Sequence, residues 1–127
     1  MKFASIRLVT ADLERLITFY ATLTGVTPTR RSPDFAEVHA GGLVLALSSE
    51  RMVRQFNAGL AIAASNRSAI VEFEVDDVEQ VHSRLSASAI EIAMPPTTMP
   101  WGNRSMLLRD PDGTVVNVFS RPHPSSA

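Results

Sequence analysis

The sequence predicts an α+β fold made of two tandem β-α-β-β-β modules, and an internal repeat is the main reason. Residues 70–85, IVEFEVDDVEQVHSRL, follow the pattern of a strand that runs straight into a helix. Residues 5–20, SIRLVTADLERLITFY, repeat this pattern when Asp12 is aligned with Asp77. Shorter alternating segments, separated by turn residues, follow each copy. Two similar units imply one architecture that is built twice.

The first strand and helix can be placed residue by residue. Phe3 to Val9 alternates as a strand with one buried face does, and Ile6 and Leu8 lie on the face expected to pack under the helix. Asp12 is expected to cap the helix, because its carboxylate can accept from the free amides of the first turn. An apolar stripe at helical spacing then continues until Gly25 ends it.

Two further strands and a linker follow. Residues 35–40 and 43–47 alternate, and Gly41-Gly42 between them predicts a tight turn. Residues 50–67 carry mixed signals: a short helix capped by Ser49 fits the beginning, whereas the remainder is small and non-periodic. We interpret this stretch as a crossover linker.

The second module repeats the plan with a shorter helix, which Asp76 or Asp77 is expected to cap. Residues 90–93 predict a brief strand, and residues 94–100 are expected to be irregular because their prolines cannot donate to a sheet. Residues 103–109 and 114–120 then predict a hairpin. Its turn, Asp-Pro-Asp-Gly at 110–113, is explained by turn geometry alone.

The chain of 127 residues therefore predicts a single domain made of two repeats. We expect the first module at residues 3–48, the crossover linker at 49–67 and the second module at 68–120. The polar, proline-containing residues 121–127 are expected to form a flexible tail.

Composition excludes several classes of function. Twelve Lys and Arg nearly balance 13 Asp and Glu, so bulk charge attracts neither nucleic acid nor an anionic membrane. The absence of cysteine excludes disulfides, thiolate zinc sites and a thiol nucleophile. No apolar run approaches the roughly 20 residues of a membrane span, and the N-terminal residues do not resemble a signal peptide. We expect a cytoplasmic protein with no nucleic-acid or membrane partner.

Strand alternation also predicts which side chains avoid the helices. They form a second face of the sheets, which meets water or lines a pocket or a subunit interface. The members of this face on the first, fifth and last strands are Ser5, Arg7, Val9, Ile70, Glu72, Glu74, Val115, Asn117 and Phe119.

Three segments together resemble a known family. ADLERLITFY, its echo FEVDDVEQVHSRL and the terminal PWGNRSMLLRDPDGTVVNVF are similar to the vicinal oxygen chelate superfamily, which groups glyoxalases, extradiol dioxygenases and bleomycin-resistance proteins. The resemblance covers residues 3–119. It implies two β-α-β-β-β modules that form a mixed, curved sheet around a cavity, and commonly a homodimer.

The resemblance also implies where a metal would be held. Metal-dependent members take ligands from the first, fourth, fifth and last strands, and the corresponding positions here are Ser5, Ala46, Ile70 and Asn117. Serine and asparagine are weak ligands for divalent ions, and alanine and isoleucine are none. The chain therefore resembles most the metal-free bleomycin-resistance branch, for which we expect no metal and no cofactor.

Several residues are candidates for contact with a ligand. Trp101, in a Pro-Trp-Gly turn, either packs over its loop or forms a stacking wall for a planar ligand. His39 lies on the same face as Glu37 and is more simply a solvated or hydrogen-bonded histidine. Arg7 either pairs with Glu72 or Glu74 or faces a polar ligand. The full candidate set is Ser5, Arg7, Phe35, His39, Ala46, Ile70, Glu72, Trp101, Asn103, Asn117 and Phe119.

These observations rank three functions. The first is a homodimer that sequesters a small aromatic or heterocyclic molecule in a metal-free cavity, with no residue assigned to catalysis. The second is a lyase, isomerase or dioxygenase with a non-standard or absent metal site, in which Glu72 or His39 acts as a general base. The third is a structural or regulatory dimer module without a ligand.

Overall fold

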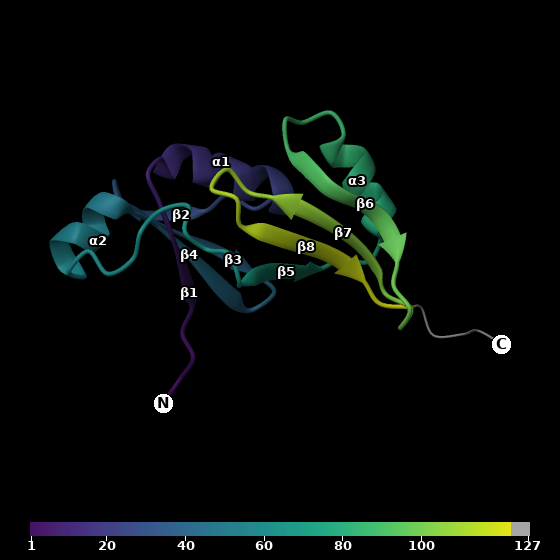
Figure 1. The fold of residues 1–127 in the computed structure, drawn as a ribbon, viewed down its shortest axis with the longest axis horizontal. Coiled ribbons are helices and arrows are strands. Elements are labelled where there is room, and N and C mark those ends of the chain that lie inside the picture. The colour runs from purple at the N-terminus through teal and green to yellow at the C-terminus, as the bar shows by residue number, and fades with distance from the viewer. Residues whose placement is uncertain (123–127) are drawn as a thin grey trace. The chain divides into compact units, whose positions relative to one another are not determined.

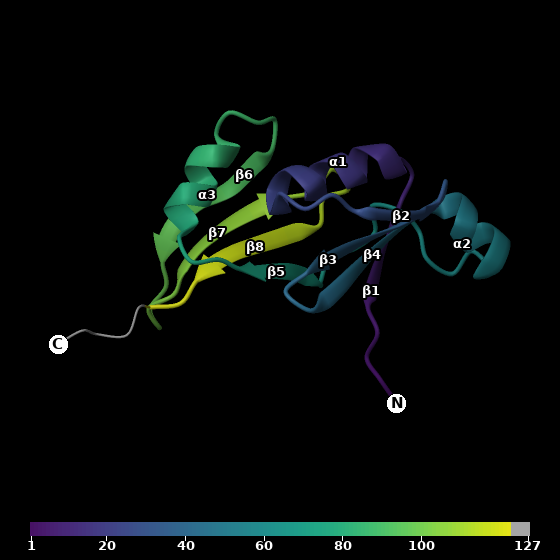
Figure 2. The ribbon, with the colours of Figure 1, turned by 180° about the vertical axis from the view of Figure 1, so that it is seen from behind.

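The structure is a computed structural model that describes residues 1–122, so the end of the expected tail, residues 123–127, lies outside the described residues. The chain divides into two compact units, Met1–Asn66 (unit 1) and Arg67–Ala127 (unit 2), which Figures 1 and 2 show from opposite sides. Among the described residues no helix is long and apolar enough to cross a membrane.

Unit 1 contains a four-stranded mixed sheet in the order β1-β4-β3-β2. β1 is parallel to β4, and the other neighbouring strands are antiparallel. α1 joins β1 to β2, and α2 follows β4 directly (Figure 1). The elements are β1 (Ile6–Thr10), α1 (Leu13–Thr24), β2 (Thr29–Ser32), β3 (Phe35–Ala40), β4 (Leu43–Ser49) and α2 (Glu50–Phe56).

Unit 2 repeats this plan, and α2 has no counterpart among its residues up to 122. Its sheet has the order β5-β8-β7-β6, with β5 parallel to β8. The elements are β5 (Ile70–Glu74), α3 (Val78–Leu85), β6 (Glu91–Thr98), β7 (Arg104–Arg109) and β8 (Val115–Ser120). The predicted α+β fold of two β-α-β-β-β modules, each with a mixed four-stranded sheet, is confirmed.

Each unit buries one helix against one face of its sheet. In unit 1, α1 packs on β3 and β4, and Leu16 and Tyr20 of its apolar stripe are buried with Val38 and Leu47 of the sheet. In unit 2, α3 packs on β6, β7 and β8. Burial of a large apolar side chain contributes about 1.5–3 kcal/mol. The buried apolar residues of unit 2 are Val78, Leu85, Met106, Leu108, Val116 and Val118.

The helix caps agree with the sequence pattern. Asp12 Oδ1 accepts from the amide of Arg15 at 3.1 Å, and Gly25 ends α1 with a φ of +71°. In unit 2, Asp77 rather than Asp76 caps α3 by accepting from two amides of the first turn. Ser49 caps α2 by accepting from Met52 at 3.1 Å. Side-chain caps therefore define where all three helices of the described residues begin.

The first strand starts later than predicted. β1 begins at Ile6, so Phe3 and Ser5 precede the sheet and are exposed. Ile6 itself remains 51% exposed, although it was expected to pack under the helix. The reason is that β1 is an edge strand of its sheet and α1 packs on β3 and β4.

The expected irregular segment after residue 93 is instead a strand. β6 runs from Glu91 to Thr98 through both adjacent prolines, and its pairing with β7 is interrupted between Ile92 and Met94 and between Met94 and Thr97. β6 is an edge strand. Proline is tolerated on an edge or at a bulge because no partner there requires its missing N–H.

The hairpin turn after β7 gives a testable prediction. Asp110 is buried, and its Oδ1 accepts from the amides of Asp112 at 2.9 Å and Thr114 at 3.0 Å. Asp110→Ala should lower the free energy of unfolding by about 1–3 kcal/mol, because it leaves these donors unpaired. Urea denaturation followed by circular dichroism measures this loss. Asp112→Ala removes a carboxylate of the same turn, and an equal loss there would contradict the explanation.

Candidate functional site

The face of the unit 1 sheet opposite α1 carries several of the predicted site residues. The strand register sets Arg7 beside Ala46 and Ala46 beside Glu37, so these residues form a row across three strands. Phe35 and His39 lie on the same face of β3 by alternation. Ser48, which the sequence pattern did not single out, is buried on this face, and its Oγ has no hydrogen-bond partner among residues 1–122.

The acidic group on this face is already engaged. Glu37 Oε1 accepts from Arg31 Nε at 2.7 Å, and His39 Nε2 lies 3.5 Å from the same oxygen. The Arg31 hydrogen bond holds the pKa of Glu37 below its ordinary value; burial opposes this shift, and His39 adds to it. Glu37 is therefore an ionised, paired carboxylate at neutral pH. It serves as a hydrogen-bond acceptor rather than as a free base.

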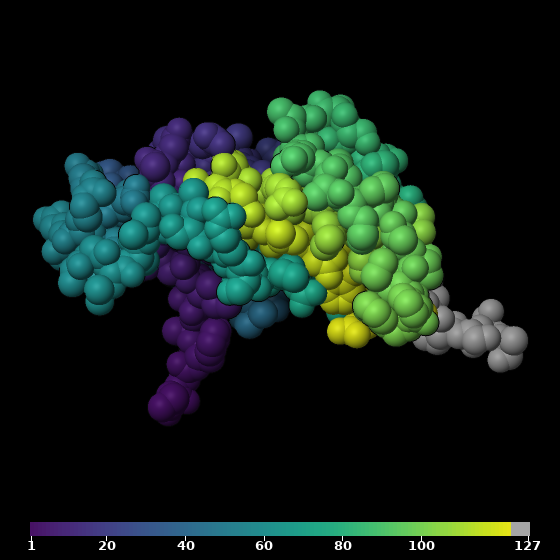
Figure 3. All heavy atoms as spheres, viewed as in Figure 1, coloured from purple at the N-terminus to yellow at the C-terminus, as the bar shows by residue number. Residues whose placement is uncertain are grey.

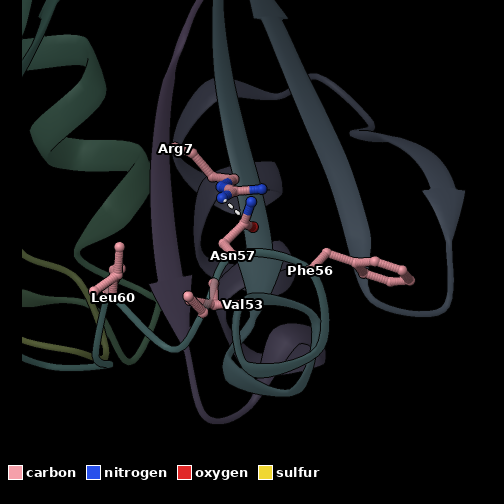
Figure 4. A pocket seen from close by; sticks show the side chains of 7 residues that line it. Arg7, Val53, Phe56, Asn57 and Leu60 are labelled. Carbon is pink, nitrogen blue, oxygen red and sulfur yellow. Dashed lines mark hydrogen bonds between the residues drawn. The ribbon is translucent and has the colours of Figure 1, made fainter.

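A pocket opens where β1 meets α2 and the chain that follows it. Its volume is about 430 Å³. Arg7 and Asn57 face each other at one side, with Val53 and Leu60 nearby, while the ring of Phe56 extends away from them (Figure 4). The lining residues are Arg7, Val53, Phe56, Asn57, Ala58, Leu60 and Ala61.

Local hydrogen bonds shape this pocket. Val53, the buried residue of α2, accepts through its carbonyl oxygen from the amides of Asn57 at 2.8 Å and Gly59 at 3.0 Å. Ala58 and Gly59 both have positive φ, 56° and 62°, which turns the chain back toward β1. Ala63 N–H donates to Glu50 Oε2 at 3.3 Å and ties down the far end of the segment. The pocket wall is thus held at both ends.

Arg7 is the charged group of the pocket. Its Nη2 donates to Asn57 Oδ1 at 2.7 Å. No carboxylate of unit 1 lies within ion-pair distance of its guanidinium. The pocket therefore combines an uncompensated cation with walls that are mostly apolar.

The corresponding face of unit 2, opposite α3, carries a carboxylate and an amide. Asn117 Nδ2 donates to Glu72 Oε2 at 2.9 Å, while Asn117 Oδ1 is buried without a partner among the described residues. Ile70 is 54% exposed at the start of β5. Phe119 is half-buried, and the guanidinium carbon of Arg121 lies 5.5 Å from its ring centre.

Trp101 and Asn103 belong to the turn that leads into β7. The turn is closed by backbone bonds from Met99 to Asn103 at 2.7 Å and from Gly102 to Met99 at 2.8 Å. Trp101 is 68% exposed, and its role as a stacking wall for a planar ligand stays a prediction.

The structure brings together only part of the predicted set. Arg7, Phe35, His39 and Ala46 share one face of unit 1, whereas Ser5 precedes β1. The charges expected to pair across strands each have a partner in their own unit: Arg7 bonds to Asn57, Glu72 to Asn117, and Glu74 to Arg121. The pocket residues of the linker were missed. Their only signal in the sequence was an apolar, small-residue stretch without periodicity.

Comparison with known proteins supplies the wider context. A family model described as Glyoxalase/Bleomycin resistance protein/Dioxygenase superfamily matches residues 2–118. A solved glyoxalase/bleomycin resistance protein/dioxygenase from Nocardioides is 32% identical, with a TM-score of 0.79 over 98% of this chain and 86% of its own. Comparison with curated proteins gives no match.

Two further solved structures have the same fold. A glyoxalase-related enzyme from Fulvimarina pelagi is 25% identical, with a TM-score of 0.81 over 100% of this chain and 94% of its own. A family enzyme from Burkholderia phytofirmans PsJN is 18% identical, with a TM-score of 0.78 over 92% of this chain and 96% of its own. At that last identity the similarity demonstrates the fold alone.

The residues at the metal positions that the resemblance implies do not fit a divalent ion. Ser5, Ala46, Ile70 and Asn117 supply at most one hydroxyl and one amide oxygen, and Asn117 already bonds to Glu72. Within residues 1–122, no three histidine, aspartate or glutamate side chains gather in a metal-binding group. We derive no metal-dependent step for this chain.

The ion pairs of unit 1 predict how its stability depends on pH. Hydrogen bonds from Arg51 and Ser49 lower the pKa of Asp34, as Arg31 lowers that of Glu37. A carboxyl whose pKa is lower in the folded state stabilises the fold above its unfolded pKa of about 4. This stabilisation should be lost as the pH falls below about 4. Urea midpoints measured between pH 3 and 7 report the slope.

Variants of the Glu37–Arg31 pair test whether this pair causes the pH dependence of stability. Glu37→Gln should make the acid loss of stability shallower, because one of the two titrating carboxyls is gone and only Asp34 remains. Arg31→Met should reduce the stability near pH 7 and make the remaining dependence shallower, because the pKa of Glu37 returns toward its ordinary value. A slope that both variants leave equal to that of the wild type would contradict the assignment.

Proposed function

Because the chain belongs to the Glyoxalase/Bleomycin resistance protein/Dioxygenase superfamily, we propose that it binds a small aromatic or heterocyclic molecule without transforming it, as a metal-free sequestering or resistance-type protein. The observation that carries this proposal is the pocket beside Arg7. It lies next to the face opposite α1, and its volume of about 430 Å³ falls in the range of small-molecule sites.

The lining of the pocket favours a flat, largely apolar ligand. Val53, Leu60 and two alanines supply aliphatic surface, and Arg7 and Asn57 supply the polar contacts. Ligand sites in general combine apolar walls with a few placed polar groups. The wall is fixed by hydrogen bonds at both ends, so little ordering entropy is lost on binding.

The carboxylates on the two sheets, taken unit by unit, support binding rather than turnover. Glu37 is paired with Arg31, and Glu72 of unit 2 accepts from Asn117, so neither carboxylate is a free base. The implied metal positions hold Ser5, Ala46, Ile70 and Asn117, which supports a metal-free mode of binding.

We also propose that the protein acts as a homodimer. Several large apolar side chains of unit 1 remain exposed, and an interface that covered them would remove apolar surface from water. Leu43 is 75% exposed and Ile62 67%. Figure 3 shows α2 and the following segment, in blue to teal, at the surface of unit 1.

Filling the pocket tests the proposal. N-phenyl-1-naphthylamine, a neutral aromatic probe that fluoresces in apolar surroundings, should bind saturably to the wild type. Ala61→Trp should weaken this binding at least about tenfold, because the indole occupies the space of the ligand. Ala87→Trp, on an exposed turn of unit 2, is the matched control. Equal binding by both variants would show that the probe lies elsewhere.

Native mass spectrometry of the purified protein tests sequestration directly. We expect a dimer that carries an organic adduct, and the adduct should be released chemically unchanged after incubation. Conversion of the adduct, abolished in folded Glu72→Gln or His39→Ala, would instead establish the enzymatic alternative.

A further inference from the structure

We propose that the pocket beside Arg7 selects amphipathic anions, so that the bound molecule carries a carboxylate or a similar oxyanion on an aromatic or aliphatic body. This inference rests on the proposed function, because it assumes that the pocket binds a small molecule. It adds the chemical class of the ligand and the residue that recognises it.

Arg7 has hydrogen-bond donors that unit 1 does not use. A guanidinium has five N–H donors, and one nitrogen of Arg7 is used by Asn57 Oδ1 at 2.7 Å. The other nitrogens are not bonded to any residue of unit 1. A planar fork of donors that remains available matches a carboxylate, which can accept two parallel hydrogen bonds.

Three other arginines of unit 1 form ion pairs within the unit: Arg30 with Glu14, Arg31 with Glu37, and Arg51 with Asp34. Arg7 has no such partner in unit 1, although it lines the pocket. Because Arg7 is exposed and water screens its charge, we expect its available hydrogen-bond donors, more than its charge alone, to select the anion.

Arg7 is held in position at the pocket by its strand and by Asn57. Arg7 lies in the middle of β1, paired in register with Ala46 of β4, so its backbone is fixed by the sheet. Asn57, at the end of α2, then holds the guanidinium at the pocket wall (Figure 4). Val53, Ala58 and Leu60 line the same pocket. The anionic end and the apolar body of one molecule can therefore be bound together.

A matched pair of probes tests the selection. N-phenyl-1-naphthylamine is neutral, and 8-anilino-1-naphthalenesulfonate has the same anilinonaphthalene skeleton with an added sulfonate. We expect the wild type to bind the sulfonate more tightly. Arg7→Met should weaken the binding of the sulfonate about tenfold to hundredfold, which is the effect of losing a charged hydrogen bond. It should change the affinity for the neutral probe less than about threefold.

Control variants separate charge from position and from fold. Arg54→Met removes a cation from α2 that does not line the pocket, and should leave the affinity for both probes unchanged. Asn57→Ala keeps the charge of Arg7 but removes the hydrogen bond that holds its guanidinium. It should therefore weaken the binding of the sulfonate less than Arg7→Met does. Arg7→Lys should retain part of the preference. If Arg7→Met does not fold, salt titration of the wild type decides, since only the anionic probe should weaken with ionic strength.

The outcomes distinguish this inference from the function on which it rests. If neither probe responds to Ala61→Trp, the pocket is not a ligand site and the proposed function fails. If both probes respond to Ala61→Trp but Arg7→Met weakens them equally or not at all, the pocket binds molecules without selecting anions. In that case the inference is overturned and the proposed function stands.

Discussion

The parallel pairing of β1 with β4, and of β5 with β8, determines which face of each sheet is covered by a helix and which is left for a functional site. Parallel neighbours cannot be joined by a tight turn, so each module needs a crossover that includes a helix. The crossovers contain α1 and α3, which pack on one face of each sheet. The opposite faces are therefore free of these helices, and the functional candidates Arg7, Ala46 and Asn117 lie on them because of this topology.

Local sequence signals were sufficient to predict the helices and strands, but not to predict which strands lie at the edge of a sheet. Asp12, Asp77 and Gly25 marked helix ends correctly, because a cap depends on the residue and its immediate neighbours. Ile6 and the prolines of β6 were misjudged, because their environment depends on edge position. Edge position is set by strand order, and alternation along one strand carries no information about that order.

The candidate site was also predicted only in part from the sequence. Alternation placed Arg7 on the face away from the helix, and the strand register sets Ala46 beside it. The other pocket wall was not foreseen, because residues 57–61 have no periodicity. Their path depends on consecutive left-handed residues, one of them Ala58 rather than a glycine. An alanine at positive φ costs roughly 1 kcal/mol, and the surrounding hydrogen bonds must offset that cost. Sequence patterns cannot report such a balance.

The residues at the implied metal positions and the charge of Arg7 both concern how an anionic ligand would be attracted. A divalent metal attracts an anionic ligand by coordination, but Ala46 on the unit 1 sheet is no metal ligand and Asn117 on the unit 2 sheet is a weak one. A guanidinium supplies charge without coordination, and it orients its partner through hydrogen bonds. It does not lower the pKa of a bound water as a metal ion does. A pocket organised by Arg7 and Asn57 is therefore chemically suited to holding an anion rather than to activating it.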